Sequence, residues 1–164
     1  MPTFIRAIVV PGPRAPVFAL MQDYDRRLSW DPFLSEARLI EAEVAGLGVK
    51  AWCVDHRGRG METEYVSFDP PARVAVRMTK GPWIFAKFAG AWIYEEVSDT
   101  ATRVVFKYHV ESRLGRVGDW ALARFFAREM DDRFDALRRA VEKLDLTVLP
   151  ESRPPGQTPL AVDE

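Results

Sequence analysis

The feature of this sequence that most constrains its fold is a long amphipathic segment between Gly118 and Leu144. Its apolar residues recur at steps of three or four, which matches the α-helical repeat of about 3.6 residues. The resulting stripe contains Leu122, Phe126, Met130, Phe134, Leu137, Val141 and Leu144. Gly118 and Asp119 supply a break and a carboxylate cap at the amino-terminal end of the predicted helix. A helix of roughly 40 Å with a single apolar stripe needs a broad apolar partner, and a curved sheet provides one.

The segments before this helix are predicted to form that sheet. Residues 3–10 are a short β-rich run that ends at a proline-rich turn, and two short helices are expected within residues 15–28. The hydrophobic period then changes to two, and glycine or proline turns divide the chain into six further strands. Their predicted ranges are 36–44, 49–56, 61–68, 73–79, 83–97 and 102–112. Short turns imply antiparallel neighbours, so the sequence predicts an α+β fold with a seven-stranded antiparallel sheet.

Length and composition favour one domain over residues 1–145. A chain of 164 residues that is 48% hydrophobic has enough apolar material to bury a sizeable core. Beyond that domain the chain holds four of its twelve prolines, and residues 146–164 are predicted to be a poorly ordered tail.

The charge balance and the single cysteine limit the classes of partner and the compartment. With 23 basic and 24 acidic side chains, the chain has no overall field that would attract nucleic acid or an anionic membrane. The lone Cys53 excludes an internal disulfide framework and fits a reducing compartment, so a cytoplasmic location is predicted. We expect neither a signal peptide nor a membrane span, because no apolar run is long enough.

The order of elements carries a family resemblance. Local features that accompany it are the helix opening Ala15-Pro16-Val17-Phe18, Asp23 ahead of Trp30-Asp31-Pro32, the corner Asp69-Pro70-Pro71, and Thr102-Arg103-Val104 at the last strand. The chain resembles the helix-grip fold of the START-like superfamily (SRPBCC), which includes polyketide cyclase/dehydrase and lipid-transfer proteins. This resemblance covers residues 3–144. It implies a curved sheet wrapped around the C-terminal helix, with a cavity between them that holds a hydrophobic small molecule or lipid.

Aromatic side chains on the last two strands are the candidates for the cavity wall. Strand alternation places Phe106 and Tyr108 on one face, and Phe88, Trp92 and Tyr94 share a face of the preceding strand. The predicted ligand-binding residues are Phe88, Trp92, Tyr94, Phe106, Tyr108, Phe126 and Met130. The alternative is that these residues are ordinary core, because aromatics both fill cores and line ligand pockets.

Candidate catalytic residues are Glu62, Glu64 and Tyr108. The two glutamates share a strand face with Val66 and Phe68, so they point inward if those apolar residues do. A carboxylate beside an apolar cavity could act as a general base, its pKa raised by burial. The alternative is a twist or bulge that returns both glutamates to solvent.

Metal and nucleotide sites are not predicted. Cys53 and His56 are three residues apart, so a strand directs them to opposite faces, and the only other histidine is His109. Cys53 is either a nucleophile or a small buried hydrophobe, and the second is the commoner role of a lone strand cysteine. The glycine pair around Arg59 lacks the third glycine of a dinucleotide fingerprint, since Thr63 stands there. We therefore predict no cofactor.

One charged pair borders the apolar stripe of the long helix. Glu129 and Arg133 are spaced i, i+4, so they either pair at the surface or reach a ligand at the cavity edge. The sequence favours the surface pair.

Taken together, these features predict binding of a small hydrophobic or aromatic molecule, for transport or sequestration. The alternative is an enzyme similar to polyketide aromatase/cyclases, in which a carboxylate or tyrosine moves protons in the cavity. A third hypothesis is a protein-interaction module that presents the convex face of the sheet. The sequence leaves open the ligand, any catalysed reaction and the oligomeric state, a homodimer included.

Overall fold

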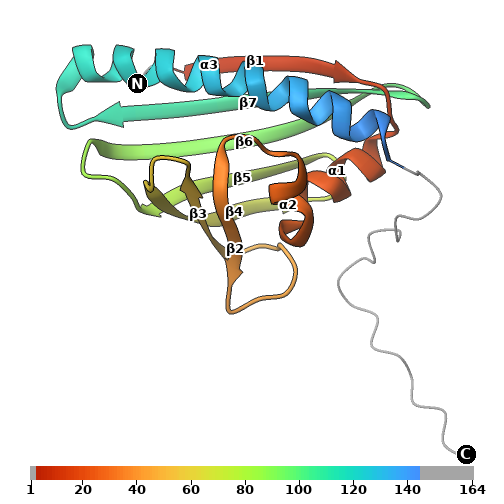
Figure 1. Ribbon diagram of the computed structural model, residues 1–164, viewed down its shortest axis with the longest axis horizontal. Helices are drawn as coiled ribbons and strands as arrows, with labels where there is room; N and C mark the ends of the chain where they lie inside the picture. The colour runs from red at the N-terminus through yellow and green to blue at the C-terminus, as the bar shows by residue number, and fades with distance from the viewer. Residues whose placement is uncertain (1–2, 145–164) are drawn as a thin grey trace, which may run out of the picture.

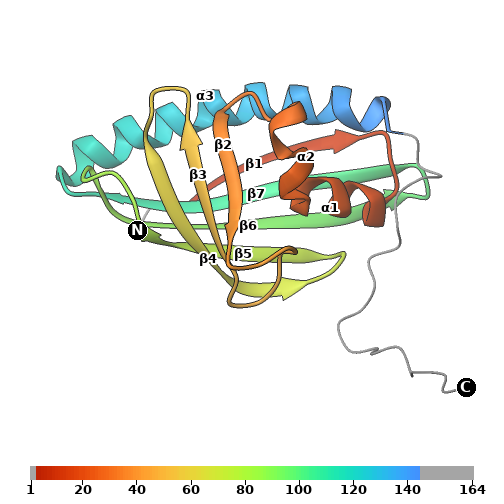
Figure 2. The same cartoon turned by 60° about the horizontal axis from the view of Figure 1, so that its bottom comes forward.

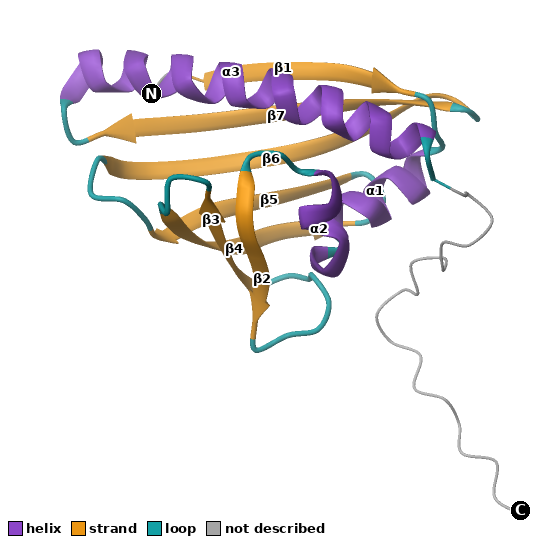
Figure 3. Ribbon diagram, in the orientation of Figure 1, coloured by secondary structure: helices purple, strands orange, loops and turns teal. Residues whose placement is uncertain are grey.

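The computed structural model describes residues 3–144 of the chain. Its elements are β1 (Thr3–Val10), α1 (Arg14–Gln22), α2 (Tyr24–Trp30), β2 (Leu34–Ile40), β3 (Lys50–Asp55), β4 (Gly60–Asp69), β5 (Arg73–Lys80), β6 (Phe85–Ser98), β7 (Ala101–Ser112) and α3 (Gly115–Glu142), shown in Figures 1 and 3. The strands form one antiparallel sheet in the order β1-β7-β6-β5-β4-β3-β2. The predicted α+β helix-grip fold, with its seven-stranded sheet and two short helices after the first strand, is confirmed.

The sheet curves around α3. In Figure 1, α3 runs lengthwise beside β1 and β7. The turned view of Figure 2 shows β2, β3 and β4 standing across the direction of β6 and β7, while α1 and α2 lie near the end at which α3 finishes. A trough closed along one side by α3 and at one end by the short helices is the space in which a cavity can form.

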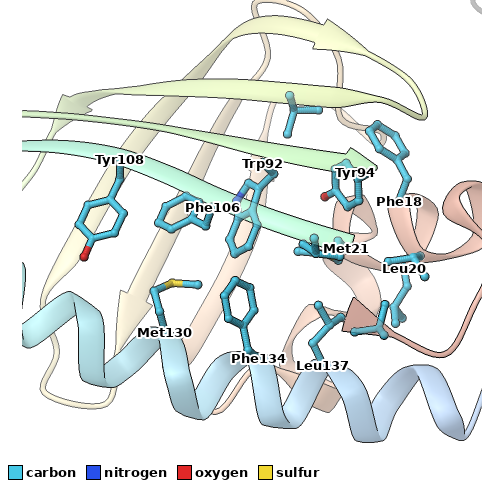
Figure 4. Close-up of a cluster of buried hydrophobic side chains, with 14 of the residues drawn as sticks. Phe18, Leu20, Met21, Trp92, Tyr94, Phe106, Tyr108, Met130, Phe134 and Leu137 are labelled. Atoms are coloured by element: carbon cyan, nitrogen blue, oxygen red, sulfur yellow. The ribbon is translucent and has the colours of Figure 1, made fainter. Parts of the chain in front are cut away.

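The apolar stripe of α3 faces the sheet, as predicted. In Figure 4, Met130, Phe134 and Leu137 point from α3 towards the aromatic side chains of β6 and β7, and all three are buried. Gly90 of β6 lies against the Phe106 ring of β7, where a Cβ would approach to 2.9 Å. A side chain at this position would therefore displace the ring, so the close packing of β6 and β7 requires glycine here.

Two predicted boundaries are wrong for local reasons. Helix α3 begins at Gly115 instead of Gly118, because the Asp119 carboxylate is not its cap but accepts a hydrogen bond of 2.6 Å from the Ser112 amide. Strand β2 ends at Ile40 instead of residue 44, where Glu41 adopts a positive φ of 54° and turns the chain. The predicted tail, residues 146–164, lies outside the described residues.

Candidate functional site

A cavity of about 150 Å³ lies between the inner face of the sheet and the helices. Its walls come from all three helices and from strands β2 to β7, so it is formed by elements distant in the sequence. One part of the wall is apolar and mostly aromatic, with Phe85, Phe88, Trp92, Phe106, Leu122, Phe125 and Phe126. Another part is polar, with Gln22, Tyr24, Arg27, Cys53, Tyr65 and Arg133. The wall therefore combines an aromatic part with a part that carries hydrogen-bonding and charged side chains.

The aromatic wall is built from stacked ring pairs. Trp92 and Phe106, direct partners across β6 and β7, have ring centroids 4.2 Å apart and an interplanar angle of 29°. Phe88 stacks on Phe126 of α3 at 5.4 Å, and Phe85 meets the same ring edge-on at 5.9 Å. Such pairs contribute about 0.5–1.5 kcal/mol each beyond area burial, so the wall is held rigidly before any ligand enters.

The predicted ligand-binding residues divide between the cavity wall and the core beside it. Phe88, Trp92, Phe106 and Phe126 line the cavity. The remaining three, Tyr94, Tyr108 and Met130, are buried in the core and are not part of its wall. Figure 4 shows Tyr94 among residues of α1, and Tyr108 and Met130 between the sheet and α3.

A chain of hydrogen bonds links the phenols around the cavity. Gln22 donates from Nε2 to the Tyr94 hydroxyl at 3.0 Å and accepts from the Tyr65 hydroxyl at 2.7 Å. The Tyr24 and Tyr65 hydroxyls are 3.2 Å apart. Burial raises the pKa of Tyr24, Tyr65 and Tyr94, so the phenols remain protonated and can donate hydrogen bonds.

Two arginines share one buried carboxylate at the polar part of the cavity. The Asp31 Oδ2 atom accepts from Arg27 Nε at 2.8 Å and from Arg133 Nη2 at 2.7 Å. Its Oδ1 atom accepts from the Phe33 amide at 3.1 Å, and Arg27 Nη1 also donates to the Met21 carbonyl at 2.8 Å. Asp31 and Arg27 are almost fully buried, so this cluster holds two positive charges and one negative charge away from water.

Electrostatics keep the Asp31 carboxylate and the Arg27 guanidinium charged. Burial alone would raise the pKa of Asp31, but the charges of Arg133 and Arg27 and their hydrogen bonds lower it below its ordinary value. Burial alone would likewise lower the pKa of Arg27, whereas the Asp31 charge raises it above its ordinary value. The cluster therefore carries a net charge of +1 at neutral pH.

Aromatic rings position Arg133 within the wall. Its guanidinium carbon lies 5.2 Å from the ring centroid of Phe33 and 5.9 Å from that of Trp92, within the range of cation–π attraction. Of the groups described between residues 3 and 144, none accepts a hydrogen bond from its buried Nε atom. The predicted surface pair with Glu129 is wrong, because Arg133 faces inward and pairs with Asp31.

A second ion pair stands at the rim of the cavity. Arg59 Nε donates to Asp55 Oδ2 at 2.7 Å, and its guanidinium lies 4.8 Å from the ring centroid of Phe125. Although burial opposes it, hydrogen bonds from Arg59 and from the Arg57 amide lower the pKa of Asp55. This pair is neutral overall, so it does not offset the net positive charge of the cluster formed by Arg27, Asp31 and Arg133.

The two glutamates proposed as general bases do not reach the cavity. Glu62 accepts from the Thr79 hydroxyl at 2.8 Å and pairs with Lys50 and Lys80, and these hydrogen bonds lower its pKa. Glu64 pairs with Arg77 at 3.0 Å on the outer face of the sheet. The expectation that they share a face with Phe68 is wrong, because the register of β4 shifts between these glutamates and Phe68.

The register shift between Tyr65 and Ser67 reverses the alternation of β4. Before it, Met61, Thr63 and Tyr65 point into the cavity, and after it Phe68 returns to the core, where it packs on Tyr65. Val66 is exposed. The third catalytic candidate, Tyr108, is buried, and its hydroxyl makes only a long contact of 3.4 Å with the Ala123 carbonyl.

The structure also gives the positions of Cys53 and of the charged side chains on the outer face of the sheet. Cys53 lines the cavity, and burial raises the pKa of its thiol, which therefore stays protonated. Between residues 3 and 144, no three or more histidine, cysteine or acidic side chains are grouped so as to hold a metal ion. The outer face of the sheet carries cross-strand ion pairs such as Lys87–Glu111 and Glu95–Arg103.

Fold and cavity together define a class of protein. A curved seven-stranded sheet around a long C-terminal helix, with a cavity between them, is the START-like architecture. Residues 1–142 match the family described as polyketide cyclase / dehydrase and lipid transport, and the chain belongs to this family. A search of curated proteins with the sequence finds no match. None of the helices within residues 3–144 is long and apolar enough to cross a membrane.

Solved structures share the fold at low sequence identity. An aromatase/cyclase from a Streptomyces species gives a TM-score of 0.76 at 14% identity, over 87% of this chain and 94% of that one. A START superfamily protein from Mycobacterium smegmatis gives a TM-score of 0.73 at 12% identity, over 86% of this chain and 97% of that one. A protein from Thermobifida fusca gives a TM-score of 0.68 at 22% identity, over 88% and 96%. At these identities the similarity establishes the fold alone.

Proposed function

We propose that the protein binds a small aromatic or other hydrophobic molecule in the cavity between the sheet and α3. The observation that carries this proposal is the aromatic wall, in which Trp92, Phe106, Phe88 and Phe126 present stacked rings to an enclosed space. A flat ligand placed against these rings would leave water and gain ring contacts at once.

The cavity volume indicates the size of the ligand. Drug-sized ligands occupy pockets of about 300–1,000 Å³, whereas an apolar cavity of about 150 Å³ accommodates benzene in another protein. The volume of about 150 Å³ here therefore suits a molecule of one or two rings. A longer ligand would require the rim around Arg59 and Phe125 to open.

Filling the cavity tests the proposal. Val76 lines the cavity, whereas Val66, on the neighbouring strand β4, is exposed. Val76→Phe should lower the affinity for the neutral two-ring probe 2-naphthamide at least tenfold in a calorimetric titration, and the matched control Val66→Phe should leave it unchanged. The proposal is refuted if the wild-type protein binds neither 2-naphthamide nor its carboxylate analogue 2-naphthoate, or if the two variants bind 2-naphthamide with equal affinity.

A second candidate function is a polyketide cyclase-type reaction, which the family description includes. The observation in its favour is that Tyr24 and Tyr65 are hydrogen-bonded to each other and line the cavity beside Arg27. A protonated phenol could donate a hydrogen bond to the carbonyl oxygen that is attacked in an aldol ring closure. In that step the attacking α-carbon gives a proton to solvent, the carbon–carbon bond forms as the C=O π bond breaks, and the oxygen takes up a proton. The new hydroxyl and a second α-proton then leave as water. A folded poly-ketone chain exceeds about 150 Å³, so this function also requires the cavity to enlarge.

Turnover separates this function from binding alone. If the protein is a cyclase, incubation with a synthetic poly-β-ketone thioester should yield an aromatic product detectable by chromatography and mass spectrometry. Tyr65→Phe should then abolish most of the turnover while largely keeping the affinity for the substrate. A wild-type rate equal to the uncatalysed rate would eliminate the cyclase.

A further inference from the structure

We infer that the cavity selects a ligand carrying a carboxylate, which Arg133 binds at the polar part of the wall. This inference rests on the proposed function, because the apolar body of the same ligand would occupy the aromatic part. It adds the chemical class of the ligand and the residue that recognises it.

The first argument is the charge of the buried cluster. Arg27 and Arg133 bring two positive charges, and Asp31 supplies one negative charge. The neighbouring Cys53 and Tyr24 are neutral, since burial raises the pKa of both. A buried charge without a counter-charge is costly, and a bound monoanion would make the cluster neutral.

The second argument concerns the guanidinium N–H groups that remain available to bind a ligand. Arg27 uses Nε for Asp31 and Nη1 for the Met21 carbonyl, so it is fixed in the protein framework. Arg133 donates to Asp31 from Nη2, and within residues 3–144 its Nη1 atom makes only a long hydrogen bond of 3.9 Å to the Met130 sulfur. Its Nε atom is buried, with no acceptor found in the described part of the chain. Arg133 is therefore the arginine that can form a further charge-assisted hydrogen bond.

The third argument concerns the type of anion. A guanidinium presents planar donors that match the planar oxygens of a carboxylate. Its position over Trp92 and Phe33 places that charge next to the aromatic wall, where a ring bearing the carboxylate would lie. The protonated Tyr24 hydroxyl also lines this part of the cavity. A carboxylate brings the single negative charge that makes the cluster neutral, whereas a phosphate dianion would leave it with a net negative charge.

The test compares two probes that differ only in charge. 2-Naphthoate and 2-naphthamide have the same rings and nearly the same shape, but the carboxylate is harder to remove from water. A cavity without an anion site would therefore prefer the amide. We expect the wild-type protein to bind 2-naphthoate at least tenfold more tightly than 2-naphthamide at pH 7, measured by calorimetry.

Arginine variants test whether Arg133 is responsible for the preference for 2-naphthoate over 2-naphthamide. Arg133→Met keeps an unbranched apolar stem and leaves Arg27 and Asp31 as a neutral pair, so folding should be retained. In this variant the affinity ratio should fall to one or below. Arg139→Met, the same change at an exposed position of α3, should leave the ratio unchanged. Arg133→Lys, which retains the charge without the planar fork, should keep part of the preference.

The outcomes distinguish the inference from the function on which it depends. If the wild-type protein binds both probes equally, or if Arg133→Met preserves the preference, the carboxylate site is refuted and the apolar binding function stands. If neither probe binds, both are refuted. The comparison of the two probes in the wild-type protein needs no variant, so a failure of Arg133→Met to fold does not decide the question.

Discussion

Replacing Asp31 by asparagine should destabilise the protein strongly, because it removes the only carboxylate shown to bridge Arg27 and Arg133. The side chain is fully buried, and its Oδ2 atom accepts at 2.8 and 2.7 Å from the two guanidinium groups. Asparagine is nearly isosteric but neutral, so the variant would bury two like charges with no counter-ion. Removing one partner of a buried ion pair costs about 3–5 kcal/mol. For a domain of this size that corresponds to a fall in Tm of about 6–20 °C.

An exposed pair provides the control for this prediction. Glu95 and Arg103 approach to 2.7 Å, as closely as the buried pair, but both side chains are about half exposed. Glu95→Gln should therefore change the free energy of unfolding by about 1 kcal/mol or less. Urea and thermal unfolding, followed by circular dichroism, measure both variants. If Asp31→Asn destabilised the protein as little as Glu95→Gln, Asp31 would not be the counter-charge that stabilises Arg27 and Arg133.

The stabilisation that Asp31 contributes depends on pH. The pKa of Asp31 is lowered from its ordinary value of 3.8, so its contribution to stability is present above pH 4 and is lost as the pH falls through the lower folded-state value. The difference in unfolding free energy between wild type and Asp31→Asn should therefore be constant from pH 7 to about pH 5 and shrink below about pH 4. Adding Arg133→Met to Asp31→Asn removes one uncompensated charge and should restore part of the stability.

The remaining predictions concern the interface between the helix and the sheet. Phe134 is buried and meets Trp92 edge-on at 6.1 Å, so Phe134→Asp should unfold the domain or lower its Tm severely, whereas Arg139→Asp on the exposed face should change it little. Equal losses in these two variants would show that the wrong face of α3 has been placed against the sheet. Tyr108→Phe removes only a long contact of 3.4 Å to the Ala123 carbonyl, so urea unfolding should show a loss of about 1.5 kcal/mol at most. A larger loss would mean that this hydroxyl has a stronger role than its geometry indicates.

The fold could be predicted from the sequence because its signals are local. The apolar stripe of α3 runs from Leu122 to Leu144, about six helical turns, and each strand alternates and is bounded by a turn. Prediction was wrong where the strand alternation is interrupted. The alternation that placed Glu62 and Glu64 with Phe68 is correct on each side of the register shift near Ser67 but not across it. A single extra residue in a strand reverses every side chain beyond it.

The polar part of the site could not be predicted, because it depends on a contact between residues far apart in the sequence. Arg133 and Asp31 are separated by 102 positions, so no local pattern shows that they pair. Two signals were present: Arg27 and Asp31 are spaced i, i+4, and Arg133 borders the apolar stripe. Helical periodicity gave the angular position of Arg133 on α3, but only the packing of α2 decided whether that edge of the helix faced water or the cavity.

The second arginine is better explained by binding than by folding. Arg27 and Asp31 alone would form a neutral pair that ends α2 and closes this part of the core. Arg133 links α3 to that pair, but an apolar side chain of similar length could pack on Phe33 and Trp92 without burying another charge. Its charge therefore lowers the stability of the empty cavity relative to an apolar replacement. A ligand carboxylate would offset that loss only when bound, so the cost of burying Arg133 would be recovered as affinity and selectivity for an anion.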